Sequence, residues 1–255
     1  MKSRVIAFID HEIGFRLLKK MLSETSDLEL VAAVTTAENG KLWWEGVESI
    51  CNEYALPLFR YEEPFINSLE FEDIDWYFLL SWKHLISNEL ISHPKKGVIN
   101  LHYSLLPDYR GVYPVNWAII DGKKTTGITY HLVDGEIDHG PIIIQESEPI
   151  LSSDTARSLQ LRLDDLAFKA FDSLCAELEK EKADLVSQAE RKQTTSYKSR
   201  KSFDQVREIN LESNYKASDL INLLRGMSFL ADSKNVYFVD PETLKKVYIT
   251  INLKV

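Results

Sequence analysis

Short apolar runs alternate with segments of helical periodicity through the first hundred residues. The runs that predict β-strands are residues 5–9, 28–34, 76–80 and 97–101. Between them, apolar positions recur at helical spacing, and the predicted helices cover residues 15–22, 45–54 and 88–92. Strands that alternate with helices in this way typically form a parallel sheet with helices on both faces. The pattern therefore predicts an α/β fold with a mostly parallel sheet.

Two more strands and a long helix follow in the next part of the chain. The strands are predicted at residues 126–133 and 142–149, and Asp134 and Gly135 mark a turn between them. Asp154 and Thr155 can cap a helix in which leucine and alanine recur at helical spacing as far as about residue 187. We expect this helix to lie along the sheet or against a second subunit.

The pattern changes after the long helix. Residues 188–202 are polar, and a solvated linker explains their basic residues better than a binding patch does. A helix at 217–229 and short strands near 236–238 and 247–253 then predict a small α+β unit. We therefore divide the chain into a main domain, a linker and a C-terminal unit, at residues 1–187, 188–202 and 203–255.

Charge and apolar pattern argue against several classes of protein. Thirty lysines and arginines against 39 aspartates and glutamates give a net charge of −9, which disfavours a nucleic-acid partner. No run of about 18 apolar residues predicts a membrane span, and the start lacks a secretory signal. We therefore expect a cytoplasmic protein. Cys51 and Cys175 form no metal-type or redox-type pair and are expected to be reduced.

Asn100 and His102 stand two residues apart at the end of an apolar strand. Side chains of a β-strand alternate between its two faces, so residues two apart point to the same face. Ligands of open α/β sheets bind outside the carboxyl ends of the strands, so the pair would face a substrate. The turn that follows contains Pro107, Arg110 and Gly111 and is of the kind that shapes a pocket.

Asp138 lies in a second informative segment, between the turn-forming glycines Gly135 and Gly140. An amide, an imidazole and a carboxylate together suit acyl transfer to an amine. The amide can stabilise a negative tetrahedral oxygen, the imidazole can move protons, and the carboxylate can orient the imidazole. We therefore expect Asn100, His102 and Asp138 to be the catalytic residues.

The segments NLHYSLLPDYRG and DGEIDHGPIIIQ resemble the signature pair of the 10-formyltetrahydrofolate-dependent formyltransferases. The resemblance spans about residues 76–150 and places that family's catalytic trio on Asn100, His102 and Asp138. It implies a Rossmann-like catalytic domain and a formyl donor, 10-formyltetrahydrofolate, whose pterin lies between two segments. The residues implied as folate contacts are Ser81, Trp82, Lys83, His84, Leu85, Ile86, Val133, Asp134, Gly135 and Ile137.

Among members of that family, the chain most resembles the sugar N-formyltransferases. The glycine-rich phosphate loop of the glycinamide ribonucleotide enzyme is replaced by Asp10, His11 and Glu12, and the acidic chain lacks the basic surfaces of the tRNA enzyme. The resemblance extends through residues 207–227 and implies a dTDP-linked amino-dideoxy sugar as acceptor, with 4-amino-4,6-dideoxyglucose favoured over the 3-amino isomer. We expect Tyr103, Ser104 and Arg110 to bind this substrate.

Other functions remain open at this point. Formylation of glycinamide ribonucleotide or of methionyl-tRNA is one alternative, and a hydrolase that releases formate from the folate could use the same trio. An inactive module that binds a sugar nucleotide or folate is a further alternative, although the intact trio argues against it. His131 and His139 flank Asp138 but match no usual metal-ligand spacing, so we expect no metal.

Several aromatic residues are open to more than one interpretation. Trp82 can line the folate pocket or fill the core. Trp43 and Trp44 suit a loop lid or a subunit contact equally well. Tyrosines of the C-terminal unit, at positions 215, 237 and 248, are expected to pack a small sheet. The C-terminal unit also suits homodimerisation.

Overall fold

The computed structural model describes residues 2–22, 28–36, 46–61, 73–180, 183–228 and 235–253. Trp43 and Trp44 lie outside these ranges. The chain forms two compact units. The first comprises residues 1–102, 129–144 and 167–190, and the second comprises residues 103–128, 145–166 and 191–255. The predicted division into two domains and a linker stays a prediction.

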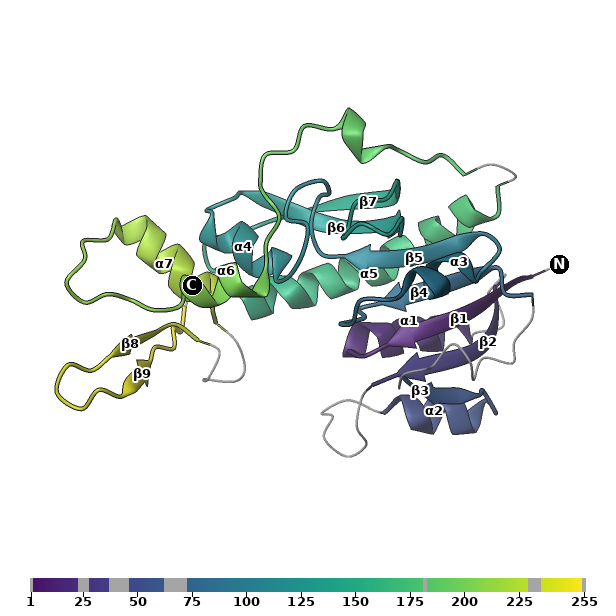
Figure 1. The fold of residues 1–255 in the computed structure, drawn as a ribbon, viewed down its shortest axis with the longest axis horizontal. Coiled ribbons are helices and arrows are strands. Elements are labelled where there is room, and N and C mark those ends of the chain that lie inside the picture. Colours follow the sequence, from purple (N-terminus) through teal and green to yellow (C-terminus); the bar gives the residue numbers. More distant parts are fainter. Residues whose placement is uncertain are drawn as a thin grey trace. The chain divides into compact units, whose positions relative to one another are not determined.

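Seven strands of the described residues form one sheet in the order β3-β2-β1-β4-β5-β6-β7 (Figure 1). Their bounds are β1 Ser3–Ile9, β2 Leu28–Thr35, β3 Leu58–Arg60, β4 Trp76–Leu80, β5 Gly97–His102, β6 Thr125–Leu132 and β7 Ile142–Pro149. Strands β3, β2, β1, β4 and β5 are parallel to their neighbours, whereas β6 is antiparallel to β5. The predicted mostly parallel α/β sheet is therefore confirmed.

Buried aromatic and branched side chains fill the first unit. The central strands β1 and β4 are buried almost throughout, as expected for strands covered on both faces. Helices α1 (Glu12–Met21), α2 (Val47–Glu53) and α3 (Asn88–Ser92) connect the parallel strands. Tyr77 and Phe8 lie at the centre of one apolar cluster, and Phe78 packs edge-on against Phe171 of the long helix α5.

Helix α5 spans Ala156–Leu178 and is shorter than predicted. At its start, the Thr155 and Ser158 side chains accept hydrogen bonds from each other's backbone N–H, a reciprocal cap. The predicted end near residue 187 is wrong. The chain turns after Leu178, and the Asp184 N–H donates to the Glu177 carboxylate at 2.5 Å. Val186 then exchanges two backbone hydrogen bonds with Ile142 of β7, which extended backbone allows and a helix does not.

The periodicity predicted only part of the second unit. Helices α4 (Pro114–Ile120) and α6 (Arg200–Gln205) were not predicted. Helix α7 (Ala217–Gly226) lies within its predicted segment, and the hairpin strands β8 (Tyr237–Val239) and β9 (Lys246–Tyr248) overlap theirs. Helix α4 packs against α7, where the Asn116 side chain donates to the Gly226 carbonyl at 2.6 Å. Tyr237 is buried and pairs with the exposed Tyr248 across the hairpin, and Tyr215 is exposed as well, so the packing role of these tyrosines stays a prediction.

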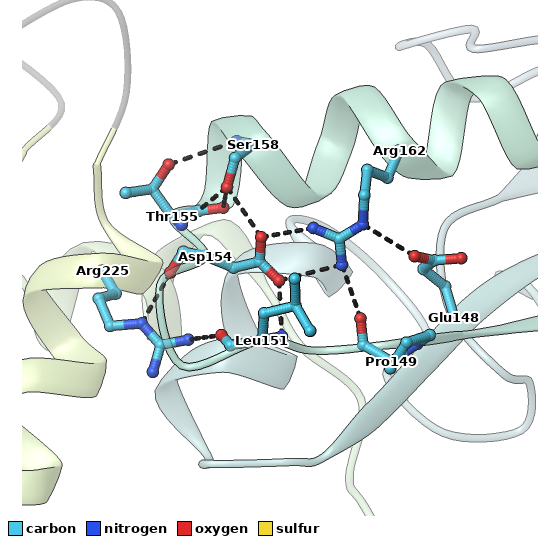
Figure 2. Close-up of polar contacts among 8 residues, drawn as sticks. All are labelled: Glu148, Pro149, Leu151, Asp154, Thr155, Ser158, Arg162 and Arg225. Atoms are coloured by element: carbon cyan, nitrogen blue, oxygen red, sulfur yellow. Dashed lines mark hydrogen bonds and ion pairs between the residues drawn. The ribbon is translucent and has the colours of Figure 1, made fainter. Parts of the chain in front are cut away.

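A polar network surrounds Asp154 in the second unit (Figure 2). Arg162 donates to both Asp154 carboxylate oxygens, at 2.5 and 3.0 Å, and to Glu148 at 2.8 Å. From α7, Arg225 donates to the Asp154 and Leu151 carbonyls, at 2.7 Å each. The C-terminal segment is therefore tied to the start of α5 by a buried guanidinium.

Among the described residues, no helix is both long enough and apolar enough to cross a membrane.

Candidate active site

The antiparallel pairing of β5 and β6 builds the centre of the site. Asn100 lies directly opposite His131, and His102 lies opposite Thr129. Opposed residues of an antiparallel pair point to the same face, so their side chains meet. The Asn100 Nδ2 atom lies 3.1 Å from His131 Nε2. The two histidine rings lie edge to face with centroids 6.4 Å apart.

Asp138 completes this group from the loop between β6 and β7. Its Oδ1 accepts a hydrogen bond from Asn100 Nδ2 at 3.3 Å, and its Oδ2 lies 3.5 Å from His102 Nδ1. The side chains of His102 and Asp138 are 7% and 13% exposed. The amide, the imidazole and the carboxylate predicted from two distant segments therefore converge in the first unit, and the carboxylate contacts both other groups.

The loop that carries Asp138 is held by hydrogen bonds to two of its backbone carbonyls. Asp138 adopts a left-handed backbone conformation with φ of 50°, which costs a non-glycine residue energy and requires support from its surroundings. The buried Gln188 supplies that support, because its side-chain amide donates to the carbonyls of Asp138 and Gly140, at 3.0 and 2.8 Å. Sequence reasoning missed Gln188, since it assigned this residue to a linker.

Gly140 gives the loop its close approach to β6, and its substitution should disturb the site. A Cβ atom at this position would lie 2.0 Å from the Leu132 carbonyl oxygen. We expect Gly140→Ala to lower the free energy of unfolding by roughly 2–3 kcal/mol, because the backbone must shift to relieve the overlap. Gly46→Ala is the matched control, since its Cβ would meet nothing within 4 Å and the expected loss is about 1 kcal/mol or less. Urea unfolding of both variants measures the difference, and equal losses would contradict the packing argument.

The first segment implied in folate binding, residues 81–86, lies at the end of β4. Trp82 packs edge-on against Phe8 and Tyr61, so it belongs partly to the core. Lys83 and His84 approach the buried Asp10 carboxylate, at 3.6 and 4.0 Å. These contacts place the segment against the carboxyl end of β1.

The second implied segment, residues 133–138, is held by short-range hydrogen bonds. Asp134 accepts from His139 and from the Glu136 N–H, and Gly135 has a φ of 94°. The Val133 N–H donates to the Val98 carbonyl. Large apolar side chains remain exposed on both segments, 76% for Leu85 and 42% for Ile137, and these suit contact with an aromatic ligand.

The residues expected to bind the acceptor belong to the second unit. Tyr103 and Ser104 are buried, and their hydroxyls donate to Asp164 and to the Asp108 carbonyl, each at 2.6 Å. The Arg110 carbonyl accepts from the Lys198 N–H. The substrate contacts of these three residues stay a prediction.

Residues 191–199 form a strap that is hydrogen-bonded to the loop of residues 103–112, although most of them are exposed as expected of a solvated linker. Arg191 and Lys192 are exposed as expected, but Asp108 accepts hydrogen bonds from the backbone N–H of Thr194 at 2.6 Å and of Thr195 at 2.9 Å. The Thr194 hydroxyl donates to the same carboxylate at 2.6 Å. The lack of a side chain at Gly111 leaves room for the strap, since a Cβ there would lie 2.2 Å from the Lys198 carbonyl oxygen.

Removing the Asp108 carboxylate should release this strap. We expect Asp108→Ala to lose about 1–3 kcal/mol of unfolding free energy, because backbone donors lose their acceptor. Tryptic cleavage after Arg191, Lys192 or Lys198 should become faster. Thr194→Val should have a smaller effect, since its backbone bond to Asp108 persists. Unchanged cleavage in Asp108→Ala would show that the strap is held by other contacts.

Among the described residues, no group of three or more histidine, cysteine, aspartate or glutamate side chains could hold a metal ion. The side chains that converge at the site are a donor amide, an imidazole and a buried carboxylate.

Comparison with family models gives two matches. Residues 45–174 match the model described as formyl transferase, and residues 202–255 match the model described as the N-formyltransferase dimerization C-terminal domain. The bifunctional polymyxin resistance protein ArnA of Wigglesworthia glossinidia brevipalpis is 34% identical over 167 residues, which are 63% of this chain and 25% of that protein. The chain spans a quarter to about half of the length of the curated relatives it matches first.

Solved structures share the fold over nearly the whole chain. A 4-N formyltransferase from Francisella tularensis has a TM-score of 0.80 at 21% identity, covering 99% of this chain and 98% of that one. An N-formyltransferase from Helicobacter canadensis, in complex with folinic acid and dTDP-3-aminofucose, has a TM-score of 0.70 at 22% identity, covering 90% and 81%. These likenesses establish the Rossmann-like fold.

Proposed function

Because the chain belongs to the formyl transferase family, we propose that it moves the formyl group of 10-formyltetrahydrofolate to the amine of a nucleotide-linked amino sugar. The observation that carries this proposal is the convergence of Asn100, His102 and Asp138, with Asp138 within 3.3 Å of the amide and 3.5 Å of the imidazole. Formyl transfer to an amine requires an oxyanion donor and a base, and this group supplies both.

In the proposed reaction the acceptor amine attacks the formyl carbon and loses a proton. A carbon–nitrogen bond to the amine forms, and the bond from the formyl carbon to N10 of the folate breaks. The proton lost by the amine is balanced by the proton that N10 gains. The Asn100 NH2 group stabilises the oxyanion of the tetrahedral intermediate, and His102 carries the proton between the two nitrogens. Asp138 orients the imidazole and balances its charge.

The similar solved structures support a sugar nucleotide as the acceptor. The Helicobacter structure contains a folate and dTDP-3-aminofucose, and the Francisella protein is described as a 4-N formyltransferase. Both resemble this chain along most of its length. We favour a dTDP-linked 4-amino-4,6-dideoxyglucose, with the pyrophosphate bound by Arg110 and the pterin between residues 81–86 and 133–138. A cytoplasmic location accompanies this proposal.

Homodimerisation through the C-terminal segment is the second part of the proposal. Residues 202–255 match the dimerization domain model, and this segment exposes large apolar side chains. They are Leu211, Tyr215, Ile221, Leu244, Val247 and Tyr248. A second copy of the chain would cover them. Analytical ultracentrifugation that shows a monomer at micromolar concentration would contradict this.

Incubation of the purified protein with the folate donor and either the 3-amino or the 4-amino dTDP sugar tests the reaction. We expect a formamide product, detected by mass spectrometry, with faster turnover of the 4-amino sugar. Formate release without an acceptor would favour the hydrolase instead. Binding of both ligands without any product would favour the inactive module.

A further inference from the structure

The buried imidazole of His131 touches the candidate site, yet the proposed reaction assigns it no role. We propose that His131 is a positioning residue, whose neutral ring fixes the side-chain amide of Asn100 with its NH2 group turned toward the reacting formyl oxygen. This inference rests on the proposed function and adds a fourth residue to it.

The hydrogen bonds of His131 identify its protonated nitrogen. Its Nδ1 lies 2.8 Å from the carbonyl oxygen of Leu132, and a carbonyl oxygen can only accept. Nδ1 therefore carries the proton, and in the neutral ring Nε2 has a lone pair. That lone pair faces Asn100 Nδ2 at 3.1 Å and accepts its N–H. Asp138 Oδ1 lies 3.6 Å from the same nitrogen, beyond hydrogen-bond distance, and takes its own hydrogen bond from Asn100 Nδ2.

The surroundings of Asn100 permit one orientation of its amide. The amide nitrogen lies close to two acceptors, His131 Nε2 at 3.1 Å and Asp138 Oδ1 at 3.3 Å. Rotating the amide by 180° would place its oxygen against both and replace two attractive contacts with two repulsive ones. His131 and Asp138 thus select the same orientation independently.

The two acceptors differ in how firmly they are held. His131 is 1% exposed and lies on β6 directly opposite Asn100, so the register of the sheet fixes its distance. Asp138 lies in a loop, and its other oxygen faces His102. When Asp138 turns to the charged imidazole during proton transfer, His131 keeps one N–H of Asn100 in place. The second N–H, held by the longer bond, then becomes the donor to the oxyanion.

Three substitutions of His131 separate positioning from packing. His131→Gln places an amide oxygen near the former Nε2 atom and keeps the acceptor for Asn100. His131→Asn places its amide near Nδ1, which keeps the donor to Leu132 but removes the acceptor. His131→Leu removes both.

We expect His131→Asn and His131→Leu to lower kcat by about ten- to a hundredfold with little change in KM, since a misplaced oxyanion donor acts on the transition state. His131→Gln should recover most of that loss. A packing role would instead lower activity in proportion to the loss of unfolding free energy, which urea unfolding of the three variants measures. Wild-type kcat in a folded His131→Leu protein would overturn the inference.

A second measurement needs no turnover. Nitrogen-15 NMR of the histidine side chains in the ligand-free protein should show His131 protonated at Nδ1 and unprotonated at Nε2. The opposite tautomer, or a doubly protonated ring, would overturn the inference. Absence of any formamide product from the wild-type protein would overturn the proposed function and leave the tautomer result standing, so the two failures are distinguishable.

Discussion

Asp138→Asn is expected to lower kcat for formyl transfer by about a hundredfold or more while the protein stays folded. The substitution keeps the size of the side chain, and asparagine tolerates the left-handed backbone at this position, where φ is 50°. It removes the negative charge that lies 3.5 Å from His102 Nδ1 and that would stabilise the imidazolium. The loss should therefore appear in the chemical step and not in folding.

A control for the change of charge comes from helix α2. Glu53 is exposed, carries the same charge and lies outside both segments implied in folate binding, so Glu53→Gln changes the net charge equally without touching the trio. Steady-state kinetics of both variants, with unfolding curves, provide the comparison. A near-normal kcat for Asp138→Asn would remove the role assigned to Asp138, and an equal loss in both variants would point to a general effect of charge.

Arg162→Met is expected to cost much of the protein's stability, about 2–3 kcal/mol of unfolding free energy. The Asp154 carboxylate is 4% exposed and would lose two hydrogen bonds from the guanidinium, which leaves a buried charge poorly compensated. The full penalty of a broken buried pair is reduced here because Arg162 is 32% exposed and partly screened by water. Lys169→Met, which removes an exposed cation from the same helix, is the control.

The same network should make stability depend on acidic pH. Burial opposes the charged form of Asp154, but hydrogen bonds from Arg162, the Leu151 N–H and Ser158 outweigh it and hold the pKa of Asp154 below its ordinary value. A carboxyl whose pKa is lower in the folded protein stabilises the fold above its ordinary pKa. It loses that contribution as the pH falls toward the folded value.

Arg162→Met should weaken this dependence, because the main hydrogen bonds that lower the Asp154 pKa are gone. Urea unfolding between neutral pH and the acid range measures the slope for the wild-type and variant proteins. Parallel curves would show that Arg162 does not control the titration.

The strand pattern was predictable because the parallel strands are continuous apolar runs. Burial on both faces leaves a strong signal in β1 and β4, and the turn at Gly135 marks the loop after β6. The trio was predictable because its members stand at the ends of such runs, in segments that resemble a known family.

Residues that act through tertiary contacts left no such signal. His131 meets Asn100 only because β6 pairs antiparallel to β5 in one register, and a shift of one residue would turn it to the other face. Gln188 reaches Asp138 only because the chain turns back after α5. Polar composition at residues 188–202 suggested solvent exposure, although the backbone there supplies donors to Asp108.

The bond between Gln188 and the Asp138 loop has a consequence for shortened forms of the protein. A fragment cut at the predicted domain boundary, residue 187, would keep every residue of the proposed trio and every strand of the sheet. It would lack the Gln188 side-chain amide, which donates hydrogen bonds to the carbonyls of Asp138 and Gly140. Any shortened form that is to keep this loop in place must therefore include residue 188.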